Sequence, residues 1–288
     1  MVDRRSFLAG VTAGSLLIAS ASGTSSAAAA ARKVQPMATP RATLGAQATP
    51  GTGAPTIVLV HGAWADGASW SGVIGGLSGD GLTVVAPANP LRSLLSDADD
   101  LVSFLASIEG PVLLVGHSYG GAVMSIAAAS ASNVVGLVYV AAYALEVGET
   151  LLDIANQFPV ETLNQALRQV PISGGTADTP AVDVYLDRAL LPSVFAADVD
   201  PAMQTILAAT ERPIAFAAFG EPAPAAAWTS LPSWALVATA DMALGPAVPF
   251  MAQRAGSTVT EIDSSHALPV SHPEAVVEVI RTAVASLA

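Results

Sequence analysis

Short apolar runs alternate with amphipathic stretches along most of the chain. The apolar runs are rich in β-branched residues and bounded by proline or glycine, which is the pattern of buried strands in a parallel sheet. The amphipathic stretches between them have helical spacing. The sequence predicts strands at residues 56–60, 83–86, 112–115, 135–141, 234–238 and 258–262, and helices at residues 69–77, 96–108, 121–131 and 273–286. This alternation predicts an α/β fold with a doubly wound, mostly parallel sheet and helices on both faces.

The alternation is interrupted between about residue 145 and residue 230, a segment called the insertion below. It contains three amphipathic stretches, at residues 150–158, 182–191 and 201–210, and no convincing strand. A long disordered loop is the alternative, but it would leave several phenylalanine and tryptophan side chains exposed to water. We therefore expect the insertion to be a helical lid on the sheet.

The first 54 residues differ in composition from the rest of the chain. Arg4 and Arg5 precede an apolar stretch at residues 7–21, and small residues follow. This order is typical of an export signal, and the arginine pair resembles a twin-arginine signal. The expected organisation is a signal peptide at residues 1–31, a flexible linker at residues 32–54 and an exported domain, periplasmic or secreted, at residues 55–288.

Composition and charge exclude several classes of protein. The chain has no cysteine, which excludes disulfides, thiolate metal sites and cysteine nucleophiles. From Pro55 onward, six arginines stand against 22 acidic residues, a formal charge of −16 that repels nucleic acid. The longest apolar run beyond the N-terminus, Gly136–Leu145, is about half of what a membrane span needs, so we expect no membrane partner for the mature protein. Neither a phosphate-binding glycine loop nor a paired-histidine metal motif occurs, so no cofactor and no metal are expected.

The segment Gly116–Gly120 carries the pattern G-x-S-x-G, with Ser118 at its centre. It lies between a predicted strand and a predicted helix, where a sharp turn exposes the serine hydroxyl above the sheet. The following helix points its positive end at this position. The context favours Ser118 as a catalytic nucleophile, although the bare pattern also arises by chance.

A serine nucleophile needs a base and an acid that orients the base. Of the four histidines, His266 is the best candidate for the base, because it follows the last predicted strand. The orienting acid is expected at a strand end between the serine and the histidine, and Asp241 meets both conditions. Asp263, three residues before His266, is the alternative.

An oxyanion formed during catalysis requires two backbone N–H groups aimed at one point. One is expected from Tyr119, directly after the serine. The other is expected from Ala63 in the loop after the first strand, where Gly62 lets the backbone turn.

Together these motifs resemble the α/β-hydrolase superfamily over roughly residues 55–285. Segments at residues 61–64, 86–90 and 266–273 are similar to those of the branch that contains plant methyl esterases, hydroxynitrile lyases and bacterial pyrethroid-hydrolase-like carboxylesterases. The resemblance implies a triad of Ser118, Asp241 and His266, with Ala63 and Tyr119 as the oxyanion hole.

The resemblance implies a serine carboxylesterase acting on small to medium apolar esters, with a small molecule as its partner. A lyase of this branch would carry a lysine beside the catalytic histidine and a threonine in the first loop, where this chain has Ala267 and Ala63. A cofactor-free perhydrolase or haloperoxidase would keep the same triad, and so could a non-catalytic receptor. These activities stay open as alternatives.

Overall fold

A computed structural model describes residues 53–175 and 181–288. The predicted signal peptide and residues 32–52 of the predicted linker lie outside the described residues. The main sheet has six parallel strands in the order β2-β1-β3-β4-β8-β9. Its strands are β1 (Thr56–Val60), β2 (Val84–Val85), β3 (Val112–His117), β4 (Val134–Val140), β8 (Ser233–Ala238) and β9 (Thr258–Ile262). The predicted class, a mostly parallel sheet flanked by helices, is confirmed.

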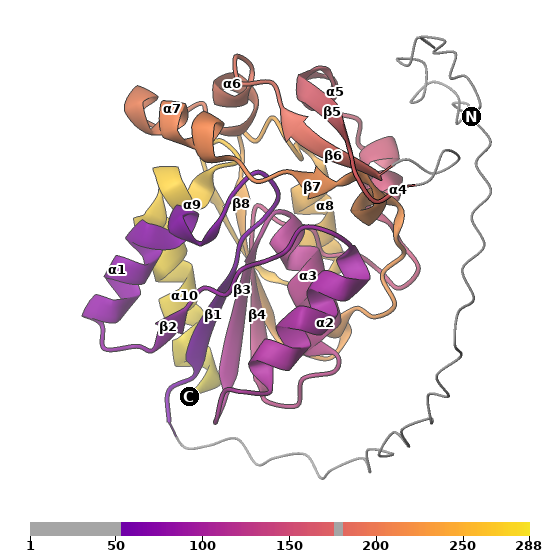
Figure 1. The fold of residues 1–288 in the computed structure, drawn as a ribbon. Helices are drawn as coiled ribbons and strands as arrows, with labels where there is room; N and C mark the ends of the chain where they lie inside the picture. Colours follow the sequence, from indigo (N-terminus) through magenta and orange to yellow (C-terminus); the bar gives the residue numbers. More distant parts are fainter. Residues whose placement is uncertain (1–52, 176–180) are drawn as a thin grey trace, which may run out of the picture. The chain divides into compact units, whose positions relative to one another are not determined.

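Helices cover both faces of this sheet (Figure 1). They are α1 (Ser71–Gly79), α2 (Leu94–Leu105), α3 (Tyr119–Ala128), α8 (Ala247–Arg254), α9 (Leu268–Ser271) and α10 (Pro273–Leu287), with the 3-10 helix η1 (Gly67–Trp70) before α1. Helices α1 and α10 pack together on one face, and α2 and α3 pack together on the other.

The strand period explains why the protein has two apolar cores. Successive side chains of a strand point to opposite faces. In β1, Ile57 and Leu59 join the core beneath α1 and α10, whereas Val58 and Val60 join the core beneath α2 and α3. A sheet that is buried on both faces needs a continuous apolar run rather than an alternating one. This is the pattern that made the strands recognisable in the sequence.

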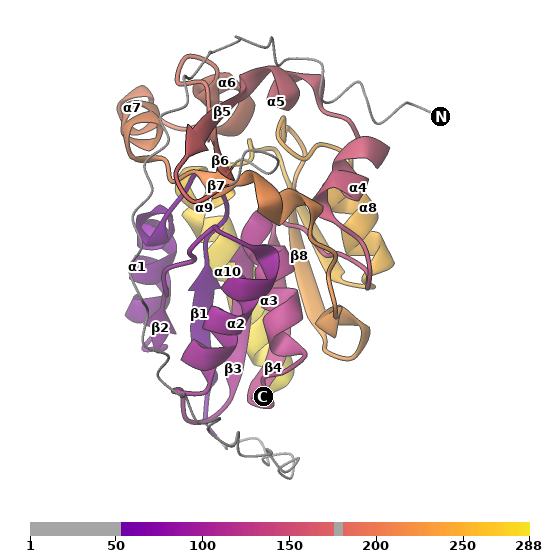
Figure 2. The same ribbon diagram turned by 45° about the vertical axis from the view of Figure 1, so that its right-hand side comes forward.

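The insertion joins β4 to β8 and combines helices with a second sheet (Figure 2). Its elements are α4 (Leu151–Gln157), α5 (Glu161–Ala166), β5 (Leu167–Ile172), β6 (Ala181–Leu186), α6 (Leu191–Phe195), α7 (Pro201–Thr210), β7 (Ile214–Ala215), η2 (Phe216–Gly220) and η3 (Ala227–Thr229). Strands β5, β6 and β7 form an antiparallel sheet. Helices α4 and α7 coincide with predicted amphipathic stretches.

The expectation that the insertion contains no strand is wrong. The sequence predicts an amphipathic stretch at residues 182–191, but its first half, residues 182–186, belongs to β6. Val184 and Leu186 are buried, and the intervening Tyr185 is only half-buried. Such a short alternation satisfies helical and strand spacing almost equally well. Pairing with β5 and β7, which lie elsewhere in the sequence, decides between the two.

Candidate active site

Ser118 occupies the turn between β3 and α3 with a backbone conformation that is rare for a residue with a side chain. Its φ is 53° and its ψ is −123°, a strain that costs on the order of 1–3 kcal/mol and persists only where the surroundings impose it. The N–H groups of Gly121 and Tyr143 both donate to the Ser118 carbonyl, at 3.0 and 3.1 Å. The side chain is therefore held at the carboxyl edge of the sheet, at the start of α3.

Two glycines let neighbouring backbone segments approach Ser118 closely. A Cβ atom on Gly62 would lie 2.7 Å from the Ser118 Cβ and 3.3 Å from its Oγ. A Cβ atom on Gly120 would overlap the carbonyl oxygens of Val60 and His61. The loop after β1 thus lies directly against the serine because neither glycine has a side chain.

Asp241 and His266 form a buried pair at the ends of neighbouring strands. Asp241 follows β8 and His266 follows β9, and the Oδ2 of Asp241 lies 2.7 Å from the Nδ1 of His266. The Oδ1 of Asp241 accepts from the N–H groups of Ala243 and Leu244, at 2.7 and 2.9 Å. The exposed fraction of His266 is 0%. The pair is thus fixed in orientation and shielded from water.

Electrostatics keep the Asp241 carboxylate ionised in spite of its burial. Burial by itself raises the pKa of this carboxyl group, but the interactions with His266 and the two amide hydrogen bonds outweigh it, so the net pKa is lowered. A carboxylate on Nδ1 selects the tautomer that carries its proton there. The Nε2 of His266 is buried and has no hydrogen-bond partner among the described residues.

His117, the residue before Ser118, links the turn that carries the serine to the loop that carries His266. Its Nε2 donates to the His266 carbonyl at 2.9 Å, and the two ring centroids are 4.9 Å apart. Burial and, to a smaller extent, the neighbouring His266 together lower the pKa of His117 to about 3. No hydrogen bond joins Ser118 Oγ to His266 Nε2 in the described structure, which is common in sites without substrate.

The alternative acid, Asp263, does not contact His266 through its side chain. It is exposed at the end of β9, and the Nδ1 of His266 is occupied by Asp241. Of the two carboxylates considered from the sequence, the structure brings Asp241 to the histidine.

Of the two predicted oxyanion donors, Tyr119 directly follows the serine and Ala63 follows Gly62, which lies against it. Ala63 is buried in the loop after β1, and the next N–H group, that of Trp64, is already used by the carbonyl of Arg212 at 3.0 Å. The side chain of Tyr119 is committed elsewhere, since its hydroxyl donates to Asp97 at 2.8 Å. Any contribution of Tyr119 to the site therefore comes from its backbone N–H.

Sequence reasoning missed the residues that fix the loop after β1. His61 donates through Nδ1 to the Gly62 carbonyl, and its Nε2 accepts from the N–H of Asn89, each at 3.0 Å. Asn89 returns a side-chain hydrogen bond to the His61 carbonyl at 2.9 Å. Burial lowers the pKa of His61, so it serves as a neutral structural ring. Asn89 lies in the segment at residues 86–90, whose sequence resembles a hydrolase branch but does not by itself predict this contact with His61.

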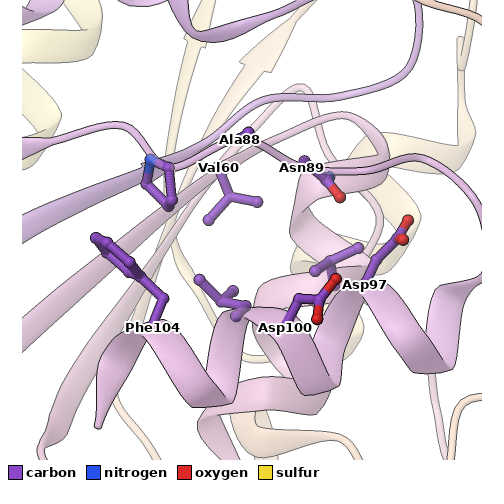
Figure 3. A pocket seen from close by; sticks show the side chains of 9 residues that line it. Val60, Ala88, Asn89, Asp97, Asp100 and Phe104 are labelled. Carbon is purple, nitrogen blue, oxygen red and sulfur yellow. The ribbon is translucent and has the colours of Figure 1, made fainter. Parts of the chain in front are cut away.

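The site is closed, and the larger pocket lies elsewhere. Ser118 is only 4% exposed. A pocket of about 300 Å³ lies between α2 and the loop after β2, and it contains none of the three residues of the predicted triad (Figure 3). A much smaller apolar pocket lies between α4, α5 and the loop after Asp241, and it includes Tyr143, whose N–H holds the Ser118 carbonyl.

In residues 53–175 and 181–288, no three metal-ligating side chains converge on one point. No helix in these ranges combines the length and the apolar character required to cross a bilayer.

Comparisons with known proteins agree with this architecture. A sequence model of the Alpha/beta hydrolase family matches residues 57–279. The chain therefore belongs to the alpha/beta hydrolase family. A comparison with curated proteins gave no match.

Solved structures with the same fold include three hydrolytic enzymes. A pyrethroid hydrolase from Sphingobium faniae JZ-2 is 24% identical, with 81% of this chain and 98% of that chain covered and a TM-score of 0.65. Polyneuridine aldehyde esterase is 16% identical, with 80% and 99% covered and a TM-score of 0.69. An extracellular alpha/beta-hydrolase from a Paenibacillus species is 21% identical, with 80% and 98% covered and a TM-score of 0.63. They match the branch that the sequence resembles, and at these identities they show the fold alone.

Proposed function

We propose that this protein is a serine hydrolase that cleaves carboxylic esters through an acyl-enzyme on Ser118. The hydrogen bond between Asp241 and His266 carries the proposal, because it fixes the orientation of the imidazole and leaves its other nitrogen free. The strained turn that presents Ser118 supports the same assignment. The pyrethroid hydrolase and the polyneuridine aldehyde esterase among the structures of this fold are consistent with ester cleavage.

The first half-reaction transfers the acyl group to the serine. His266 Nε2 takes the proton from Ser118 Oγ as this oxygen attacks the ester carbonyl carbon. The carbonyl oxygen becomes an oxyanion that accepts hydrogen bonds from the N–H groups of Ala63 and Tyr119. The C–O bond of the ester then breaks, and the alkoxide leaves as the alcohol with the proton from His266.

The second half-reaction restores the enzyme. His266 takes a proton from water, whose oxygen attacks the acyl carbon, and the acid leaves as the proton returns to Ser118 Oγ. Throughout, the ionised Asp241 stabilises the protonated imidazole and holds its orientation.

We further propose that the substrates are small to medium, largely apolar esters. The small pocket beside Tyr143 is lined mainly by apolar side chains of the insertion and of the loop after Asp241. It adjoins the carbonyl of Ser118 through the Tyr143 N–H. Apolar walls with a few polar groups at the reacting centre are typical of small-molecule sites.

The proposal is tested by short-chain nitrophenyl ester hydrolysis and by labelling with a fluorophosphonate. In the labelling reaction Ser118 Oγ bonds to phosphorus, fluoride leaves and the proton passes to His266. Ser118→Ala should abolish labelling and lower turnover on the order of 10⁴-fold or more. Ser125→Ala, a change of the same size within α3, should keep both activities. Equal turnover in wild type and Ser118→Ala would refute the proposal.

We also propose that the protein is exported by a twin-arginine route. Replacing Arg4 and Arg5 with lysine preserves the charge but removes the arginine pair. We expect this variant to accumulate inside the cell, as measured by fractionation and immunoblot. The matched control replaces Arg32 and Arg41 with lysine and should be exported normally. Undiminished export of the Arg4/Arg5 variant would exclude this route.

A further inference from the structure

Asp198, a residue of the insertion between α6 and α7, lies against the loop that carries His266. Its Oδ2 accepts from the Ser264 hydroxyl at 2.8 Å and from the Ser265 N–H at 3.1 Å, and its Oδ1 accepts from the Ser265 hydroxyl. The Oδ2 also lies 3.3 Å from the Nε2 of His272. One carboxylate therefore gathers the two residues that directly precede the base.

A second set of contacts from the insertion holds the other side of the base. The N–H of Ala267 donates to the carbonyl of Phe195 at 2.8 Å. The Phe195 ring stands on edge against the His266 ring, with centroids 5.0 Å apart. The insertion thus contacts the residues before His266, the residue after it and the ring itself.

The main domain also holds this loop, since the N–H of Ala240 donates to the Ser264 carbonyl at 3.1 Å and His117 donates to the His266 carbonyl. Ser265, the residue directly before the base, depends on Asp198, because within the described residues its N–H and its hydroxyl both donate to that carboxylate alone. Hydrogen bonds from Ser265 and Ser264 lower the pKa of Asp198 in spite of its partial burial, which raises it. Asp198 is therefore ionised at neutral pH, and both of its carboxylate oxygens are free to accept hydrogen bonds from this loop.

We propose that Asp198 is a positioning residue, which aligns His266 only while the insertion is seated on the main sheet. Because Ser118 is buried, the insertion must shift to admit a substrate. A shift that moves Asp198 releases the His266 loop, and the return of the insertion restores the base to its place. Substrate enclosure and alignment of the base are thereby coupled. This inference rests on the proposed function.

The test compares Asp198→Ala with Asp198→Asn. The alanine variant removes every acceptor. The asparagine variant keeps one acceptor for the Ser265 N–H, and its amide group donates to a serine hydroxyl, so the loop is held without the charge. Asp263→Ala is the matched control, because it removes an exposed carboxylate from the same loop.

The first measurement is the rate of fluorophosphonate labelling, which needs no knowledge of the natural substrate. A displacement of about 1 Å in a catalytic group costs on the order of 10²-fold in rate, so we expect Asp198→Ala to be slower by about 10- to 100-fold. Asp198→Asn should stay within about fivefold of wild type, since a half-exposed charge contributes little. Asp263→Ala should match wild type.

The second measurement is the low-field NMR signal of the His266 Nδ1 proton in its hydrogen bond to Asp241. We expect it to be sharp in wild type and Asp198→Asn, and broadened or lost in Asp198→Ala. Loss of stability alone would leave this signal unchanged in the folded fraction. If Asp198→Ala does not fold, the double variant Ser264→Ala/Ser265→Ala provides the same comparison with a smaller expected loss.

The outcomes separate this inference from the proposed function. If wild type is labelled and Ser118→Ala is not, but Asp198→Ala is labelled as fast as wild type, Asp198 has no positioning role. Equal losses in Asp198→Ala and Asp198→Asn would also overturn it, because charge would then be the cause. If wild type itself is not labelled, the proposed function fails first.

Discussion

The three buried histidines differ in the partners of their ring nitrogens. Both nitrogens of His61 are hydrogen-bonded, which leaves it no capacity to take a proton. His117 uses Nε2 to hold the His266 carbonyl, and its lowered pKa makes it a weak base. His266 combines a carboxylate on one nitrogen with a free second nitrogen. The partners of the rings, rather than their positions in the sequence, distinguish the base from the structural histidines.

The role of Asp241 leads to a prediction at this scale. An asparagine there has nearly the same shape, but its amide group donates to Nδ1 and moves the imidazole proton to Nε2. We expect Asp241→Asn to lower nitrophenyl ester turnover on the order of 10⁴-fold. Asp263→Asn should change the turnover less than about threefold, because the Asp263 side chain is exposed and the Nδ1 of His266 already bonds to Asp241. A larger loss in Asp263→Asn would reverse the assignment of the acid.

At the scale of elements, the insertion is attached to the main domain at several points on its own sheet. The indole N–H of Trp64 donates to the Val184 carbonyl at 2.9 Å. Arg92 pairs with Asp183 at 2.6 Å and also donates to the Pro213 carbonyl. Strands β6 and β7 are therefore anchored to the main domain, in addition to the contacts that Asp198 and Phe195 make with the His266 loop. Helix α7, by contrast, contains no buried residue.

Removal of one attachment should loosen this part of the insertion selectively. In Arg92→Ala we expect hydrogen exchange of the β6 amides to rise about three- to tenfold, because Asp183 and the Pro213 carbonyl lose a partner. The matched control is Arg281→Ala, which breaks the ion pair between Arg281 in α10 and Asp80 at the end of α1. Equal exchange at β6 in both variants would show that Arg92 does not hold the insertion.

The main sheet was predictable from the sequence, and the insertion was only partly so. Strands such as β1 and β3 are continuous apolar runs between helix-forming stretches, so local pattern and tertiary environment agree. Strand β6 becomes a strand only by pairing with β5 and β7. Asp198 gave no signal either, because its partners Ser264 and Ser265 are 66 and 67 residues away.

At the scale of the whole molecule, burial of neutral histidines couples stability to pH. Burial lowers the pKa of His117 and of His61 below the value of 6.5 in the unfolded chain. The unfolded state therefore binds more protons than the native state over this range. The stabilising effect of both histidines is complete above about pH 6.5 and is lost as the pH falls, for His117 down to about pH 3.

This coupling predicts an acid-sensitive fold. With a pKa of about 3, His117 alone should lower the free energy of unfolding by about 2 kcal/mol between pH 7 and pH 5. Urea denaturation at several pH values measures how the free energy of unfolding depends on pH. His117→Gln keeps a donor for the His266 carbonyl but does not titrate. In this variant the loss of unfolding free energy between pH 7 and pH 5 should be smaller by that amount. The same pH dependence of the unfolding free energy in wild type and His117→Gln would contradict the prediction.

Asp241 and His266 follow the insertion in the sequence. This order determines when activity arises during synthesis. A ribosome that adds about 5–20 residues per second makes Ser118 roughly 7–30 s before His266. Until strand β9 has been made and has paired with β8, the growing chain carries a serine without its base. Under the proposed mechanism the nascent protein is inert toward the esters of the cell that makes it, and it acquires activity only after His266 has been translated and β9 has joined the sheet.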